Sequence, residues 1–202
     1  MSAPMSKAKP LDDRIHRVSW LAARARVNLD LFVFLKCQTN LDKFGDVLDE
    51  RSSLFDFIRT ANEHEFVARI VNLFHPQDDT DNFPKLVGEA ERVGKIGPAM
   101  CSSIRAQIGA AASALKVVKT IRNKVVSHQD DTRSKPDIYK LVQPTLRMFI
   151  ELSDQSLAIA GALCSAIGLQ QQAVFTCPVV QLEKMLAELQ RSARTADSWE
   201  WL

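Results

Sequence analysis

The segment "PAMCSSIRAQIGAAASALKVVKTIRNKVVS", Pro98 to Ser127, decides the fold class. Its apolar residues recur every three or four positions, which is the spacing of one face of an α-helix. Proline suits the first position of a helix, where the missing N–H group would have no partner in any case. The polar run "HQDDTRSKPD" then ends the pattern. We predict one long helix here, with a buried face formed by Ile104, Ile108, Ala111, Leu115, Val118, Ile121 and Val125.

Most of the remaining chain shows the same helical spacing. The chain has only seven glycines and no Asn-Gly or Asp-Gly hairpin signal. We therefore predict an all-α protein, a compact antiparallel helical bundle with extra short helices. The pattern is interrupted around Gly45 and Ser52, where we expect breaks. The other predicted helices run from about Leu11 to Cys37, from Lys85 to Val93, from near Pro144 to a cap at Gly168, and from Pro178 to Ala193.

Length and composition indicate one globular domain, since the chain has 202 residues, of which 46% are hydrophobic and 25% charged. We expect a flexible tail over 1–10, a single helical domain over 11–195 and a C-terminal tail over 196–202. The first ten residues lack the apolar stretch of a signal peptide. Four widely spaced cysteines show neither a disulfide framework nor a zinc-site spacing, which favours a reduced, cytoplasmic protein without metal or cofactor.

Residues 155–182 carry no formal charge, which raises the question of a membrane span. The apolar part, "LAIAGALCSAIGL", is 13 residues long, whereas a bilayer requires about 20. We interpret it as a buried core helix and expect no contact with a membrane.

Charge is distributed unevenly, although the formal net charge is only +2. Residues 92–147 carry eleven basic and three acidic side chains, a balance of +8, so the rest of the chain is −6. Residues 94–129 contain no acidic side chain, whereas a solvated helix normally mixes signs. A phosphate-bearing partner such as RNA would explain this bias. Ion pairs to acidic residues of the preceding helices, such as Asp46, Asp49 and Glu50, would explain it equally well.

Arg122 and His128 lie in this acid-free segment and have side chains suited to metal-independent RNA cleavage. A histidine can take a proton from the 2′-hydroxyl or donate one to the leaving 5′-oxygen. A guanidinium offers a fixed fork of donors to the phosphate oxygens. Asn123 follows the arginine directly and could bond phosphate or hold the histidine. Six residues on an ideal helix leave two side chains about 120° apart, so a joint site requires a frayed helix or two chains.

Spacing alone does not identify this pair. Arginines that precede a histidine by five to seven positions occur three times, against about 0.8 expected by chance. Arg59 and His64 lie in an acidic neighbourhood, and Arg69 and His75 precede the acidic loop "PQDDTD". Both surroundings would repel phosphate, so context favours the pair in the acid-free segment.

The stretch "IRNKVVSH", Ile121 to His128, resembles the motif of the HEPN superfamily. In that motif an arginine, commonly followed by a polar residue such as asparagine, precedes a histidine by four to six intervening residues. The order of segments, with "FVARIVNLF" and a charged loop before the motif helix, is similar to the HEPN subgroup of abortive phage infection, the U-type Abi proteins. The resemblance extends over roughly 11–165.

This resemblance implies a helical bundle that dimerises through the motif helices and pools two arginines and two histidines in one cleft. Such a homodimer would be a metal-independent endoribonuclease of toxin–antitoxin or phage-defence type, with RNA as substrate and an antitoxin protein as a further partner. Arg122 would hold the phosphate, His128 would act as acid or base, and Asn123 would support them. The expected RNA-binding side chains are Lys116, Lys119, Lys124, Arg105 and Arg133.

Two other interpretations stay open at this point. The chain could be a non-catalytic HEPN-like helical module that binds a nucleotide, an RNA or a protein partner. Alternatively, Arg122 could be an ion-pair residue at the edge of the core and His128 an ordinary helix stop.

Overall fold

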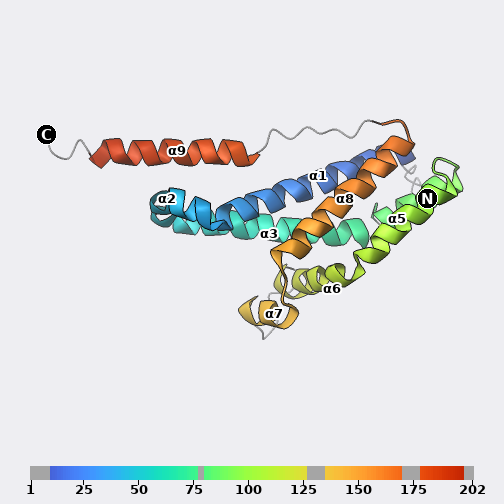
Figure 1. The fold of residues 1–202 in the computed structure, drawn as a ribbon, viewed down its shortest axis with the longest axis horizontal. Coiled ribbons are helices and arrows are strands. Elements are labelled where there is room, and N and C mark those ends of the chain that lie inside the picture. Colours follow the sequence, from blue (N-terminus) through green and yellow to red (C-terminus); the bar gives the residue numbers. More distant parts are fainter. Residues whose placement is uncertain (1–9, 77–79, 127–134, 170–177, 198–202) are drawn as a thin grey trace, which may run out of the picture. The chain divides into compact units, whose positions relative to one another are not determined.

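Helices make up most of the part of the chain that the structure describes (Figure 1). The computed structural model describes residues 10–76, 80–126, 135–169 and 178–197. Within these ranges it has no β-strand, which confirms the all-α class. The elements are α1 (Leu11–Lys36), α2 (Gln38–Glu50), α3 (Ser52–Phe74), α4 (Phe83–Arg92), α5 (Pro98–Ala110), α6 (Ala112–Ile121), a π-helical turn η1 (Arg122–Val126), α7 (Lys135–Val142), α8 (Leu146–Ala166) and α9 (Pro178–Asp197).

Contacts between residues divide the chain into two compact units. The first unit comprises residues 1–23 and 67–173, and the second comprises residues 24–66 and 174–202. Each unit therefore combines stretches that are far apart in the sequence. The single domain over 11–195 stays a prediction.

Helix α8 supplies the central apolar surface of the first unit. Its second half carries no charged residue, so other helices have to cover it. Helices α4, α5 and α6 pack against it. None of the described helices combines the length and the apolar character that a bilayer crossing requires. The prediction of a buried core helix is confirmed. The buried side chains of α8 are Phe149, Leu152, Ser153, Ser156, Ile159, Ala160, Leu163 and Cys164.

Local sequence determines where α4 and α8 begin or end. The buried Asn82 precedes α4, and its Oδ1 accepts a hydrogen bond from the Lys85 N–H at 3.0 Å. Gly168 ends α8 with φ +73°, a left-handed conformation that glycine adopts without strain. The N–H groups of Gly168 and Leu169 then bond the carbonyls of Ser165 and Cys164, which completes a Schellman motif. The predicted cap at Gly168 is confirmed.

In the second unit, α2 and α9 pack together. The Lys43 Nζ lies 2.7 Å from Glu183 Oε1, and the Gln190 side chain donates to the Lys43 carbonyl oxygen at 3.1 Å. These polar contacts border an apolar cluster. Its buried members are Phe34, Leu35, Phe44, Val47, Leu48, Phe55 and Leu186.

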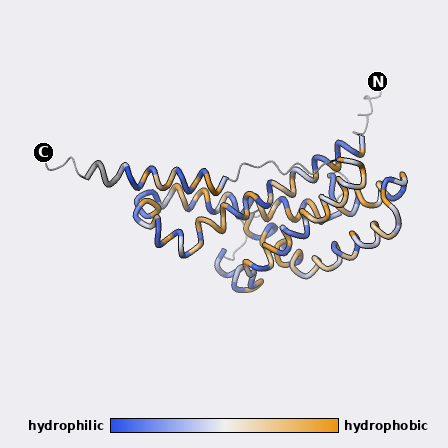
Figure 2. The backbone as a smooth tube through the Cα atoms, turned by 45° about the horizontal axis from the view of Figure 1, so that its top comes forward, coloured by the Kyte–Doolittle hydropathy of each residue, from blue (hydrophilic) through white to orange (hydrophobic). Residues whose placement is uncertain are grey.

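The break predicted at Gly45 is wrong, because α2 runs through it without interruption. Figure 2 shows hydrophobic and hydrophilic segments alternating along the helices, as expected for elements with one buried face. In α2 this face consists of Phe44, Val47 and Leu48, which are at most 7% exposed. Their burial outweighs a penalty of about 1 kcal/mol for a glycine inside a helix. The break expected near Ser52 is confirmed, since α2 ends at Glu50 and α3 begins at Ser52.

The single long helix predicted over 98–127 is also wrong in part. It starts at Pro98 as predicted, but it divides at Ala111 into α5 and α6 and then continues as the π-helical turn η1. Gly109 and the alanines that follow offer little side-chain support to the backbone at this point. The predicted buried face is confirmed in part. Ile104, Ala111, Val118 and Ile121 are at most 2% exposed, whereas Ile108, Leu115 and Val125 are half-buried.

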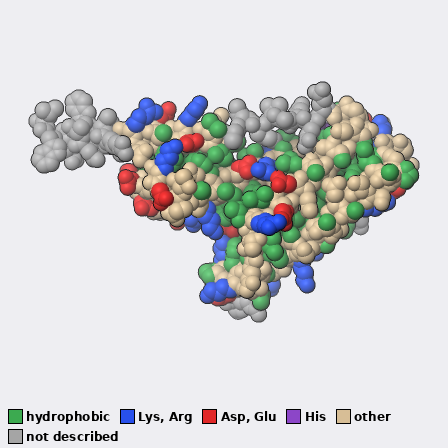
Figure 3. Space-filling model, in the orientation of Figure 1, with side chains coloured by type: hydrophobic (Ala, Val, Ile, Leu, Met, Phe, Trp, Pro, Cys, Tyr) green, Lys and Arg blue, Asp and Glu red, His purple; other side chains and the backbone are tan. Residues whose placement is uncertain are grey.

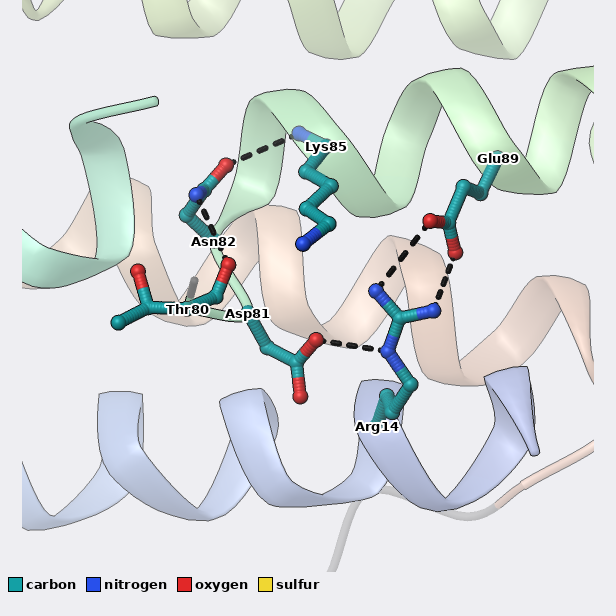
Figure 4. Close-up of polar contacts among 6 residues, drawn as sticks. All are labelled: Arg14, Thr80, Asp81, Asn82, Lys85 and Glu89. Atoms are coloured by element: carbon teal, nitrogen blue, oxygen red, sulfur yellow. Dashed lines mark hydrogen bonds and ion pairs between the residues drawn. The ribbon is translucent and has the colours of Figure 1, made fainter. Parts of the chain in front are cut away.

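A three-way ion pair holds the start of α1 against α4 and the loop that precedes it (Figure 4). The Arg14 Nε donates to Asp81 at 2.7 Å, and its two terminal nitrogens donate to the two carboxylate oxygens of Glu89. Burial lowers the pKa of Arg14, but the hydrogen bonds that it donates to Glu89 and Asp81, together with their negative charges, outweigh this effect, so the pKa is raised overall. One planar guanidinium therefore joins two elements that are about 70 residues from α1 in sequence.

Alanine substitutions at Gly45 and Gly168 are expected to have opposite effects on stability. A Cβ atom at either position meets nothing within 4 Å, so packing does not decide the result. In α2, Gly45→Ala should stabilise by about 0.5–1 kcal/mol through helix propensity. Gly168→Ala should destabilise by about 1 kcal/mol because the positive φ is strained for alanine. Urea unfolding monitored by circular dichroism measures the change in the free energy of unfolding for each variant. A change in the same direction for both variants would contradict these predictions.

Arg14→Met should destabilise the first unit by about 2 kcal/mol. The Arg14 and Asp81 side chains are only 13% and 14% exposed, so the change leaves carboxylates without their cation. The expected loss lies between that for an exposed pair, about 0–1 kcal/mol, and that for a buried one, about 3–5 kcal/mol. Arg147→Met is the matched control, because Arg147 is 87% exposed and pairs only with Glu151 on its own helix. Equal urea midpoints for the two variants would show that the three-way ion pair contributes nothing.

Candidate functional site

Helix α6 presents one apolar and one basic face. Val118 and Ile121 are fully buried, and α6 packs against α7 and α8. Because an α-helix has 3.6 residues per turn, this packing turns Lys116 and Lys119 to the opposite side, where both are exposed. On the face drawn in Figure 3, Lys and Arg side chains project from the region of α6 and α7.

The basic face of α6 borders a groove of about 290 Å³ in the first unit. This groove, called here the α3–α6 groove, lies between the end of α3 and α6. Its apolar lining includes Val71 and Phe74, which are buried, and Leu115, which is half-buried. Its polar side chains are those of His75, Lys116 and Lys119, and none of the lining residues is acidic. The full lining is Val71, Phe74, His75, Pro76, Ala112, Leu115, Lys116 and Lys119.

Two lysines line this groove, and one of them contacts a histidine. The Lys119 Nζ lies 2.9 Å from the His75 Nε2. An ammonium group can only donate, so the ring Nε2 acts as the acceptor and the neutral ring carries its proton on Nδ1. His75 directly follows α3, and its N–H still bonds the Val71 carbonyl oxygen. The carboxyl end of α3 therefore also favours the ammonium of Lys119.

Carboxylates do not neutralise these lysines within the described part of the chain. Neither Lys116 nor Lys119 forms an ion pair with any described residue. In the loop after α3, Asp81 bonds Arg14 instead. Ion pairs of these lysines with Asp46, Asp49 or Glu50 stay a prediction, because those three residues belong to the second unit.

Arg122 opens the π-helical turn that follows α6. Its side chain is half-buried, and Nη1 donates to the Asn123 Oδ1 at 3.0 Å. The structure thus brings together two of the three residues predicted to be catalytic. The other N–H groups of this guanidinium have no partner among the described residues. Single π-helical turns occur frequently at functional sites.

The remaining predicted site residues are placed differently. His128 and Arg133 lie outside the described residues, so the convergence of Arg122 and His128 stays a prediction. Lys124 is exposed on η1. Arg105 lies on α5, where its Nη2 is 2.8 Å from Glu91 Oε2. The hydrogen bond to Glu91 raises the pKa of Arg105, and the same bond lowers the pKa of Glu91.

Among the described residues we find neither a buried thiol with a lowered pKa nor a cluster of metal-binding side chains. Burial and a hydrogen bond to Glu91 both raise the pKa of the Cys101 thiol, which keeps it protonated and unreactive. Within the described ranges, no three His, Cys, Asp or Glu side chains are grouped so that they could hold a metal ion. The basic and polar groups on α6 and η1 therefore form the candidate site.

Sequence reasoning missed His75 as a site residue. The acidic loop that follows His75 argues against a phosphate site there, but the structure places its ring against Lys119, 44 positions further along the chain. The available signal was local: a histidine that ends an amphipathic helix, after the buried Leu73 and Phe74. Its partner could not be deduced without the packing of α3 and α6.

Comparisons with known proteins identify no relative. No family model, no curated protein and no solved structure matches the chain.

Alkylation should distinguish the described cysteines. Cys37 is exposed and should react rapidly with iodoacetamide at pH 8. Cys101 is fully buried and has a raised pKa, and Cys164 is also buried, so both should react only on the timescale of unfolding. Peptide mass spectrometry after timed quenching measures each rate, with urea-unfolded protein as the control. Rapid labelling of Cys101 in the native protein would contradict its placement.

Proposed function

We propose that the chain is a metal-independent endoribonuclease of HEPN toxin or abortive-infection type. In this proposal Arg122 and His128 from two copies of the chain form a composite site at a homodimer interface. RNA is the substrate, and an antitoxin protein is a further partner.

One observation carries the proposal: Arg122, already bonded to Asn123, follows a helix whose exposed lysines have no described carboxylate partner. This arrangement matches what phosphate recognition requires, a rigid fork of donors beside an electropositive surface. The resemblance of "IRNKVVSH" to the HEPN motif adds the histidine and the dimer.

The proposed reaction is a transphosphorylation within the RNA strand. One His128 takes the proton of the 2′-hydroxyl, and the 2′-oxygen attacks the adjacent phosphorus. The bond from phosphorus to the 5′-oxygen breaks, and the His128 of the second copy donates a proton to that oxygen. The products are a 2′,3′-cyclic phosphate and a 5′-hydroxyl end. Arg122 stabilises the charge that builds on the non-bridging oxygens.

A second candidate function is a non-catalytic HEPN-like module that binds RNA, a nucleotide or a protein. The α3–α6 groove favours RNA or nucleotide among these, since it combines an apolar lining with two lysines. This module would need neither His128 nor a dimer.

Cleavage of labelled RNA in EDTA separates the two functions. The wild-type protein should cut, and Arg122→Ala and His128→Ala should each reduce the rate by about 100- to 10,000-fold. Arg147→Ala and His16→Ala are matched controls because both side chains are exposed on other helices. Circular dichroism and the melting temperature verify the fold of each variant.

Two results would contradict the nuclease proposal. The first is cleavage that is indifferent to both Arg122→Ala and His128→Ala. The second is a strictly monomeric mass at micromolar concentration in sedimentation velocity, because a composite site requires two copies.

A further inference from the structure

We propose that the α3–α6 groove binds one unpaired base of an RNA strand, with the adjacent phosphates held by Lys116 and Lys119. The inference rests on the proposed function for its choice of RNA as the source of the base. It adds a substrate requirement, single-stranded RNA, and a second element, α3, to the site on α6 and η1.

The lining of the groove matches a flat, largely apolar ring. Val71, Phe74 and Leu115 provide an apolar surface that is partly open to solvent. Its volume of about 290 Å³ lies just below the range for sites of drug-sized ligands, about 300–1,000 Å³. The groove therefore suits one ring system with its sugar. A base within a duplex could not enter, because it is stacked and paired.

Two side chains that line the groove are cationic donors, as a phosphodiester requires. Lys116 and Lys119 contribute ammonium groups, and neither has a described carboxylate partner. His75 accepts from Lys119 through Nε2, which leaves its Nδ1–H as a further donor. The positions of Arg122 and Asn123, one helical turn beyond Lys119, give a strand bound at Lys119 a short path to the proposed cleavage site.

A cavity in the second unit lacks these properties. It measures about 200 Å³, and its lining includes Asp49, Asp56 and Arg59. The Arg59 guanidinium pairs with Asp56 at 2.9 Å, so this lining offers no free cation and would repel a phosphate. Charge complementarity thus selects the α3–α6 groove for RNA.

Binding is tested in EDTA with the His128→Ala protein, so that cleavage does not consume the ligand. Fluorescence anisotropy compares a short single-stranded RNA, the same strand in a duplex, and an oligomer of equal length without bases. The single strand should bind about tenfold more tightly than either of the others, because only it can insert a base. Equal affinities for the three oligomers would overturn the inference without relying on any groove variant.

Groove variants test the two parts of the site separately. Ala112→Trp fills the groove and should lower the affinity for the single strand to that of the oligomer without bases. Ala106→Trp, on an exposed position of α5 outside the groove, should leave it unchanged. The logarithm of the association constant falls linearly with the logarithm of the salt concentration. Lys116→Gln and Lys119→Gln should each make this slope less steep by about 0.7. Lys184→Gln, exposed on α9, controls for the change in net charge.

The outcomes distinguish this inference from the proposed function. Base-dependent binding that Ala112→Trp abolishes, in a protein that never cuts RNA, supports the groove and defeats the nuclease proposal. If cleavage requires Arg122 and His128 but is unchanged in the Ala112→Trp variant, the nuclease proposal is supported and the role of the groove is defeated. Saturable binding of adenosine monophosphate without any binding of the single strand would overturn RNA as the source of the base.

Discussion

The uncharged half of α8 is the constraint on which the first unit depends. Each large apolar side chain that leaves water contributes about 1.5–3 kcal/mol, so this surface drives other helices to cover it. Helix α6 does so with Val118 and Ile121, which are fully buried. Because the geometry of a helix is fixed, its lysines must then face away from the core. The basic surface of the candidate site is therefore a direct consequence of how α8 is buried.

Much of the fold follows from local signals in the sequence. Pro98 and Pro178 begin helices where predicted, and Gly168 ends α8, because proline and glycine act on the backbone within one turn. The wrong predictions have non-local causes. A break at Gly45 is plausible from helix propensity alone, but the apolar cluster of the second unit buries the residues around it. The division at Ala111 was not predicted, although Gly109 and the alanines that follow it support the helical backbone only weakly.

The candidate site also combines residues that are close in sequence with one that only tertiary packing brings near. Lys116, Lys119, Arg122 and Asn123 share one stretch of chain, so their proximity could be predicted. His75 could not, because the acidic loop behind it suggested repulsion of phosphate. Distance along the chain does not show which charged groups face each other. In the structure Asp81 bonds Arg14, and Lys119 of α6 lies against His75.

The turn at Arg122–Val126 also bears on how this chain can evolve. A π-helical turn holds one more residue than an α-helical turn, so losing a residue here would restore regular helix and leave the buried positions of α6 unaltered. The same deletion within α8 would rotate every later side chain by about 100° and carry its apolar positions out of the core. The packing of the first unit should therefore tolerate a change of length between Lys124 and Val126 and reject one between Phe149 and Cys164.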